Sequence, residues 1–390
     1  MPVVNRLAEM ADEITEWRRD IHEHPEIGYE VHRTAKVVAD RLAEFGCDEV
    51  VTGVGRTGVV GVIRGQGSSG RVVGLRADMD ALPIPERTGR PWASKNDGAM
   101  HACGHDGHTA MLLGAAKHLA ETRNFDGTVV LIFQPAEEGG AGAKAMIDDG
   151  LLTRFNVERV YGLHNWPGMP VGSFHIRSGS QMASADFFSI TIEGRGGHAA
   201  RPHLACDPVL AGAAIVTAAQ SIVARNVDPL DAAVVSITTF HAGTASNVIP
   251  QRAKLSGTVR TLKPETRDMV EAQLAAVVEQ VGLAHRVEAR LDYRREYPVL
   301  VNDEEEARFV ADVAAKVVGA NNVDAATAPT MGAEDFSFML NERPGAFIFA
   351  GIGEDVANLH NEAYDFNDAL LPIGASYWTT LVEAALPRAG

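Results

Sequence analysis

The chain has 390 residues, of which 46% are hydrophobic and 22% are charged, and its formal net charge is −16. A chain of this length exceeds one ordinary core, so we expect two domains, and its composition is that of a globular protein rather than a disordered or fibrous one. The negative charge argues against nucleic acid or an anionic membrane surface as a partner, because phosphate groups are bound by clustered Lys and Arg.

The cysteine content and the N-terminal residues indicate where the protein works. Cys47, Cys103 and Cys206 are too few for a disulfide framework. Eight of the first twenty residues are charged, which the apolar core of an export signal does not tolerate. The longest uncharged helical stretch, residues 208–224, falls short of a membrane span and is interpreted as a buried or dimer-facing helix. We therefore expect a cytoplasmic protein with no membrane contact.

The first half of the chain alternates short apolar strands with helical segments. The first 25 residues predict one amphipathic helix that ends before Pro25, because the residue before a proline is biased away from helical geometry. Strands are predicted at residues 57–63, 72–75, 128–133 and 157–163, with a helix at 108–119. This order predicts an α/β fold with a mostly parallel sheet flanked by helices, in which ligands bind beyond the carboxyl ends of the strands.

The pattern changes between residues 185 and 293. Strands are predicted at 186–192, 233–240, 248–261 and 287–291, with helices that begin at Pro208 and Pro264, the second of which stops at Gly282. The order β-α-β-β-α-β is that of a ferredoxin-like α+β module. We expect this module to be inserted into a first domain made of residues 1–184 and 294–390, because the candidate metal ligand His360 lies beyond it.

Side chains that bind metals occur in four segments far apart in the sequence. They are Cys103 with His105, Glu137 with Glu138, His164, and His360. Residues 101–108 alone contain three histidines and one thiol among eight positions, a density that core packing does not explain. Any one of these side chains is more often structural, but four such segments, each close to a predicted strand end, favour a two-metal hydrolase.

The residue types in these segments restrict the metal and the chemistry. Thiolate, imidazole and carboxylate together suit zinc, with manganese, cobalt or nickel as alternatives. The consecutive carboxylates of Glu137 and Glu138 lie in a predicted loop and point in different directions. One can therefore bind a metal while the other reaches a water molecule on it. The alternative for this pair is a solvated acidic turn.

Eight motifs in this chain resemble those of the dinuclear-metal aminoacylase and carboxypeptidase superfamily, in particular its hippurate hydrolase and auxin-conjugate amidohydrolase branch. The resemblance covers nearly the whole chain. In chain order the motifs are residues 22–26 (HEHPE), 76–83 (RADMDALP), 101–108 (HACGHDGH), 134–140 (QPAEEGG), 162–165 (GLHN), 196–200 (GGHAA), 332–336 (GAEDF) and 359–362 (LHNE). The resemblance implies a zinc-peptidase-like catalytic domain and an inserted lid and dimerisation domain.

The resemblance also implies a role for individual residues. Cys103 would lie between two divalent metal ions, and Glu137 would be the general base. The remaining metal ligands would be His105, Glu138, His164 and His360. In the wider superfamily a metal-binding His stands where this chain has Arg76 and a bridging Asp stands where it has Cys103, and both departures agree with the hippurate hydrolase branch. Asp78 and Asp80 would then accept hydrogen bonds from ligand imidazoles, with a structural role at the strand end as the alternative.

In the inserted domain, the resemblance implies that His198 stabilises the oxyanion of the tetrahedral intermediate and acts in the active site of a partner subunit. Asn247 and Arg260 would hold the substrate carboxylate, which a guanidinium binds through two parallel hydrogen bonds. As residues at a sheet surface they would need no functional explanation. A homodimer is expected, with a tetramer as the alternative.

The expected activity is metal-dependent hydrolysis of N-acyl amino acids, such as hippurate-like, N-acetyl or indoleacetyl conjugates. A metallocarboxypeptidase and an N-acetyl-diaminopimelate-type deacetylase are alternatives with the same chemistry. A thiol hydrolase with Cys103 as nucleophile would need no metal, and an inactive metal-binding scaffold would not need Glu137. His108 has no assigned role, and His22 is expected to serve packing or capping.

Overall fold

The computed structural model describes residues 4–388 and divides into two compact units. Unit 1 comprises Met1–Gly179, Val301–Ala328 and Asp335–Gly390, and unit 2 comprises Ser180–Leu300 and Pro329–Glu334. β7 (Gly179–Met182) and β14 (Leu300–Asn302) lie where the chain enters and leaves unit 2. Residues 329–334 join unit 2 because the amide of Thr330 donates to the carbonyl of Gln181, a long-range contact that the sequence pattern does not reveal.

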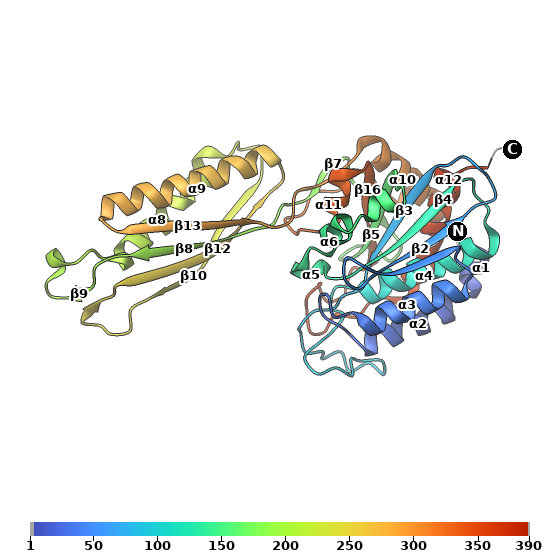
Figure 1. Cartoon of the computed structure of the whole chain (residues 1–390), viewed down its shortest axis with the longest axis horizontal. Helices are drawn as coiled ribbons and strands as arrows, with labels where there is room; N and C mark the ends of the chain where they lie inside the picture. Colours follow the sequence, from blue (N-terminus) through green and yellow to red (C-terminus); the bar gives the residue numbers. More distant parts are fainter. Residues whose placement is uncertain (1–3, 389–390) are drawn as a thin grey trace. The chain divides into compact units, whose positions relative to one another are not determined.

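Unit 1 contains an eight-stranded sheet (Figure 1). In spatial order its strands are β1 (Glu49–Val54), β2 (Gly58–Arg64), β4 (Thr128–Gln134), β3 (Val72–Asp78), β5 (Arg159–Pro167), β16 (Gly345–Gly353), β6 (Phe174–His175) and β15 (Val323–Asp324). The four central strands β4, β3, β5 and β16 are mutually parallel, whereas β1, β2 and β6 pair antiparallel with β2, β4 and β16 respectively. The predicted mostly parallel sheet is confirmed.

Helices cover this sheet because its central strands are apolar on both sides. In β4, Val129, Leu131 and Phe133 belong to a core cluster shared with helices, and Val130 and Ile132 between them are also fully buried. That cluster draws on α1 (Asn5–Glu9), α2 (Ala11–Glu23), α3 (His32–Glu44), α4 (His105–Thr122), α10 (Glu304–Val318) and α12 (Leu371–Ala385). Further short helices are α5 (Glu137–Gly140), α6 (Gly142–Asp148), α7 (Leu151–Arg154) and α11 (Ser337–Glu342).

Unit 2 has the predicted ferredoxin-like order. Its elements are β8 (Asp186–Glu193), α8 (Pro208–Ser221), β10 (Ala233–Ala242), β12 (Arg252–Thr261), α9 (Pro264–His285) and β13 (Glu288–Arg295). The antiparallel sheet has the order β10-β12-β8-β13. Alternate side chains of β8 and β12 are buried, as expected for a sheet with helices on one face. A separate two-stranded ribbon consists of β9 (Gly197–His198) and β11 (Val248–Ile249).

The structure corrects three predicted elements. The single N-terminal helix is wrong: Met10 leaves helical geometry (ψ 1°) and buries its side chain in the core, which divides α1 from α2. The single strand at 248–261 is also wrong, because β11 pairs with β9 whereas β12 pairs with β8, and Pro250, which has no N–H, lies at the change of partner.

The third correction concerns α9, which continues through Gly282 to His285 instead of ending there. A Cβ at position 282 would lie 2.9 Å from the Cβ of Ala289 on β13. The glycine therefore permits close packing of helix against strand and does not end the helix.

The expectation that residues 208–224 fall short of a membrane span is corrected by the helical stretch Pro208–Asn226, which alone among the described residues has the length and apolar composition of a span. Within its most apolar window, 33% is buried inside the protein. Its inner residues, such as Ile215 and Ala219, are fully buried against the unit 2 sheet, whereas Leu210 is 58% exposed. The stretch is therefore one covering layer of the unit 2 core.

Candidate metal centre

The four predicted ligand segments meet in unit 1 at the carboxyl ends of the parallel strands. Their ligand atoms form groups within which all atoms lie within 4.8 Å of one another: Cys103, His105 and His164; Cys103, Glu138 and His360; and His105, Glu137 and Glu138. Cys103 and His105 each belong to two of these groups. The thiol therefore lies between two positions that a metal ion could occupy.

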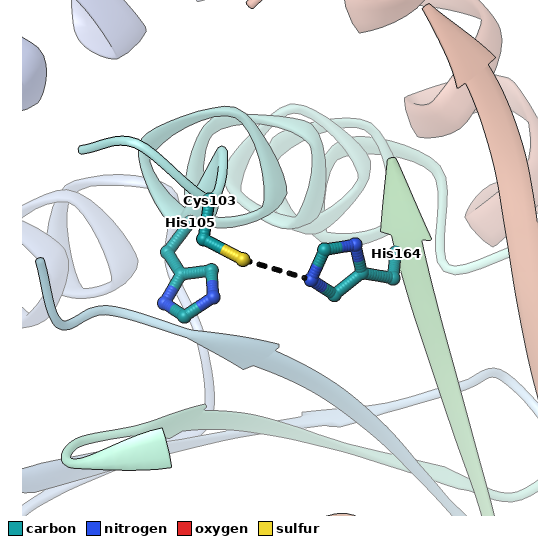
Figure 2. A group of neighbouring side chains, drawn as sticks. All are labelled: Cys103, His105 and His164. Atoms are coloured by element: carbon teal, nitrogen blue, oxygen red, sulfur yellow. Dashed lines mark hydrogen bonds between the residues drawn. The ribbon is translucent and has the colours of Figure 1, made fainter. Parts of the chain in front are cut away.

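The first possible metal position is the one formed by Cys103, His105 and His164. Its two imidazoles are oriented by hydrogen bonds from their Nδ1 atoms. His164 Nδ1 donates to the carbonyl oxygen of Asn165 (2.7 Å), and His105 Nδ1 donates to that of Asp80 (2.8 Å). In the neutral ring, each Nε2 then carries a lone pair. His164 Nε2 lies 3.4 Å from Cys103 Sγ, with the His105 ring beside the thiol (Figure 2), and His105 Nε2 is buried without a hydrogen-bond partner. Both nitrogens are of the kind that binds a divalent metal.

Gly104 allows Cys103 and His105 to reach the same site from one short turn. It has a left-handed backbone (φ 88°), which favours glycine. A Cβ at this position would lie 2.0 Å from Asn165 Oδ1 and 2.6 Å from the Tyr364 hydroxyl. Asn165 Nδ2 also donates to that hydroxyl (2.8 Å), so the turn is held against the end of β5.

The carboxylate of Asp80 fixes the segment that carries the two glutamates. Its two oxygens accept the backbone N–H groups of Glu137 and Glu138, both at 3.0 Å. The preceding Ala136 has a left-handed backbone (φ 54°), which starts the short α5 directly after β4. The Asp80 side chain thus organises the two carboxylates, while its backbone carbonyl orients His105.

The charges around Cys103 favour a cation. Burial raises the pKa of the Cys103 thiol well above its ordinary value, and the carboxylates of Glu138 and Glu137 raise it further. Burial by itself would lower the pKa of His105, but the carboxylates of Asp78 and Asp80 raise it to about 10. The buried carboxylates therefore stabilise positive charge at this place, which a divalent ion supplies and which would also stabilise the thiolate.

The residues present fit a metal centre on the chemistry of their donors. Two lone-pair nitrogens, a thiol and a carboxylate converge in a buried site, and this mixed donor set suits zinc and its neighbours among the divalent transition metals. His360 approaches from a different segment: its amide donates to the carbonyl of Ala102 (2.8 Å) and its Nε2 lies 3.1 Å from Glu138 Oε1. Its side chain is 52% exposed, so this side of the site is open to solvent.

Arg76 and His108 also lie in the site. The Arg76 guanidinium donates to Asp78 Oδ2 (2.7 Å), and His108 Nδ1 lies 2.6 Å from Asp78 Oδ1. Burial by itself would raise the pKa of Asp78, but the charge of Arg76, the neighbouring His105 and the hydrogen bond from His108 hold it well below its usual value. Sequence reasoning gave His108 no role, although its position three residues after His105 on one helix places both on the same face.

The candidate residues of unit 2 lie at two ends of that unit, and His198 and Asn247 are exposed whereas Arg260 is half-buried. His198 and Asn247 lie together, because the amide of Ala199 donates to the carbonyl of Asn247 (3.0 Å). Arg260 is eight residues along β12 from Arg252, or roughly 26 Å at about 3.3 Å per residue. The ribbon adjoins the Arg252 end of β12 through the two residues Pro250 and Gln251, so one unit 2 does not bring Arg260 to His198.

Comparisons with known proteins agree with this geometry. Residues 74–384 match Peptidase family M20/M25/M40. The chain is 44% identical to a hippurate hydrolase of Campylobacter jejuni over 98% of both chains. It is 41% identical to an IAA-amino acid hydrolase of Arabidopsis thaliana, covering 95% of this chain and 86% of the relative. A solved structure described as a dinuclear metal-binding M20 peptidase from Bacillus subtilis is 35% identical, with a TM-score of 0.85 over 97% and 99% of the two chains. The resemblance carried by the sequence motifs is confirmed.

Proposed function

The chain belongs to peptidase family M20/M25/M40, and we propose that it hydrolyses the amide bond of N-acyl amino acids with bound divalent metal ions. The observation that carries this proposal is the shared thiol: Cys103 belongs to two groups of ligand atoms, and Glu137 lies in a third group beside them. Two adjoining metal positions with a carboxylate next to them suit amide hydrolysis by a two-metal site with a general base.

When bound, divalent ions would polarise the amide carbonyl and lower the pKa of water from 15.7 toward about 7. Glu137, held by the Asp80 carboxylate, is proposed to accept a proton from the attacking water and to pass it to the leaving amine. Glu138 is proposed to bind metal with Cys103 and His360, and His105 and His164 to complete the other position. General acid-base help of this kind is worth about 10²–10⁴ in rate.

Zinc is the proposed metal, with manganese, cobalt or nickel as alternatives, because a thiolate and two imidazoles are soft to borderline ligands. The competing thiol hydrolase is opposed by the electrostatics. A nucleophilic cysteine needs a lowered pKa, whereas burial and neighbouring carboxylates raise the pKa of Cys103. The cysteine is better suited to a metal ligand than to a nucleophile.

The proposed substrate class follows from the relatives. Hippurate and an IAA-amino acid are both amides between an acyl group and the nitrogen of an amino acid. The alternatives are a metallocarboxypeptidase and an N-acetyl-diaminopimelate-type deacetylase. We propose a cytoplasmic enzyme for small N-acyl amino acids, consistent with the few cysteines and the acidic composition.

A homodimer through β10 is supported by the difference between the two edges of the unit 2 sheet. The β13 edge exposes charged side chains, namely Glu288, Arg290, Asp292 and Arg294. Such charges block pairing with another strand. The β10 edge contains no Asp, Glu, Lys or Arg and exposes five consecutive residues from Thr238 to Ala242. β10 is therefore the edge that can pair with a second copy.

His198 is proposed to stabilise the oxyanion in the site of the partner subunit. The amide of Ala200 donates to His198 Nδ1 (3.1 Å), so the proton of the neutral ring is on Nε2. This nitrogen has no hydrogen-bond partner among the described residues and can donate to an oxyanion. Arg260 is proposed to bind the substrate carboxylate, since it is half-buried over the Phe187 ring and forms no ion pair with a described carboxylate. The distance between Arg260 and His198 within one unit 2 supports their origin in different subunits.

Metal removal tests the proposed function most directly. Prolonged chelation should abolish hydrolysis of hippurate or another N-acyl amino acid, and added zinc, manganese, cobalt or nickel should restore it. The control is thiol alkylation of the metal-loaded enzyme, which should have little effect because Cys103 is buried and ligated. Activity that survives metal removal but is lost on alkylation would replace this proposal with the cysteine nucleophile.

A further inference from the structure

His108 connects the ends of two neighbouring parallel strands behind the candidate metal centre. Its Nδ1 lies 2.6 Å from Asp78 Oδ1 at the end of β3, and its Nε2 lies 3.0 Å from the backbone nitrogen of Asn165 in β5. Asn165 directly follows His164, and the His108 and His164 rings meet edge to face with centroids 4.6 Å apart. All four side chains are buried.

These contacts determine which nitrogen of His108 carries the proton. The backbone N–H of Asn165 is a donor only, so Nε2 of His108 must accept and cannot be protonated. Nδ1 therefore carries the proton and donates to the Asp78 carboxylate. Neither nitrogen retains a lone pair for a metal, although Asp78, His105 and His108 have potential ligand atoms within 4.8 Å of one another.

We propose that His108 is a positioning residue for His164 and that it secures one of the two metal positions. It acts through its bond to Asn165, which fixes the backbone next to His164, and through its ring, which supports the His164 imidazole. This inference rests on the proposed function, since it assumes that His164 binds a metal. The ligands of the two metal positions would then be held in place by different neighbouring residues.

His108 should affect only one of the two metal positions because of the residues that it contacts. The position formed by Cys103, His105 and His164 includes the supported imidazole. The position formed by Cys103, Glu138 and His360 is held instead by the Asp80 bond to the Glu138 amide and by the Ala102 bond to the His360 amide. Loss of His108 should therefore lower the metal affinity of the first position and leave that of the second unchanged.

The test is zinc binding by competition with a chelator, together with the visible spectrum of the cobalt-substituted protein. His108→Phe keeps an aromatic ring and removes both hydrogen bonds. It should weaken one of two zinc-binding steps by about 10–100-fold, the usual effect of losing a partner that orients a metal ligand. His118→Phe is the matched control, because His118 is a largely buried histidine further along α4. It should leave both steps and the cobalt spectrum unchanged.

Two conservative variants separate the hydrogen bonds. His108→Gln places an amide near the Nε2 position and should retain the bond to Asn165, whereas His108→Asn places one near Nδ1 and should retain the bond to Asp78. The proposal expects tighter zinc binding in the Gln variant than in the Asn variant. These variants also serve if His108→Phe fails to fold.

Activity gives a second readout. Raised zinc concentration should restore turnover in His108→Phe, because all ligands and Glu137 remain, while KM stays near that of the wild type. The proposal is overturned if both zinc steps weaken equally, if neither weakens, or if Asn supports binding better than Gln. A wild-type protein that binds no metal would instead refute the proposed function itself.

Discussion

The candidate residues of unit 1 and those of unit 2 differ in how firmly the fold holds them. Cys103, His105 and His164 are buried, and both histidines have an Nδ1 that donates to a backbone carbonyl. His198 and Asn247 lie on an exposed two-stranded ribbon. A metal site needs ligands fixed before the ion arrives. A hydrogen-bond donor for the oxyanion can instead be supplied by a second subunit after the metal site has formed.

Under the proposed mechanism, the two units contribute in different ways to one reaction. The unit 1 centre is preorganised, since its donor atoms converge on Cys103 within a single folded unit. The unit 2 residues have no such convergence, because β12 separates Arg260 from the ribbon. We therefore expect substitutions in unit 1 to act within one subunit and those at His198 to act between subunits.

The largest effect is expected at Glu137. Glu137→Gln should lower kcat by at least about 10², because an amide cannot accept the proton of the attacking water. Its zinc content should stay near that of the wild type, as measured by metal analysis of the purified protein. Glu138→Gln is the matched comparison and should lower zinc affinity instead. The reverse pattern would exchange the roles of the two carboxylates.

Mixed dimers test whether His198 acts between subunits. His198→Ala alone should lower kcat by about 10²–10³, the effect of losing one oxyanion donor. After joint unfolding and refolding with equal Glu137→Gln protein, random pairing makes about half of the dimers mixed, each with one intact site. About a quarter of wild-type activity should return. If mixed dimers form and activity does not return, His198 serves its own subunit.

The β10 edge is expected to give a smaller effect, on assembly. Thr238→Lys introduces a charge that occurs twice across a two-fold interface, so the dimer dissociation constant should rise at least about tenfold. Sedimentation across a concentration series measures this constant. Asp292→Lys, on the already charged β13 edge, is the control and should leave it unchanged. Equal weakening by both substitutions would contradict an interface through β10.

The smallest effect on activity is expected from a buried ion pair that supports unit 1. His22 Nδ1 lies 2.8 Å from Asp106 Oδ2. Burial by itself would lower the pKa of His22, but Asp106 and Glu86 raise it to about 9 from 6.5. Because the folded pKa is raised, the stabilisation is complete below pH 6.5 and is lost as the pH rises through about 9.

The free energy of unfolding should accordingly fall between pH 6.5 and 9, with a contribution on the order of 3 kcal/mol from His22. Urea unfolding at several pH values measures it. His22→Asn should be less stable at pH 6 and should lose less stability on raising the pH. His32→Asn, at a largely exposed histidine, is the control. If the free energy of unfolding fell equally with rising pH in the wild type and in His22→Asn, this role for the ion pair would be contradicted.

The sequence by itself determined the architecture of both units and the candidate metal ligands, because these depend on local patterns. Apolar runs predicted the central strands of unit 1, and the β-α-β-β-α-β order predicted unit 2. The candidate ligands could be named because thiol, imidazole and carboxylate are rare together at strand ends. Their distances could not, since four distant segments meet only when β3, β4 and β5 align in one sheet.

Tertiary structure decided everything that depends on contacts between distant segments. Gly282 lies inside α9, where its missing side chain lets β13 pack close to the helix. Met10 separates α1 from α2 because its side chain is buried in the core. The Asp80 carboxylate binds the Glu137 amide across 57 residues. His108 was left without a role because its partners belong to two other strands. Local residue preference is encoded in neighbouring positions, whereas a hydrogen bond between strands exists only after the sheet has formed.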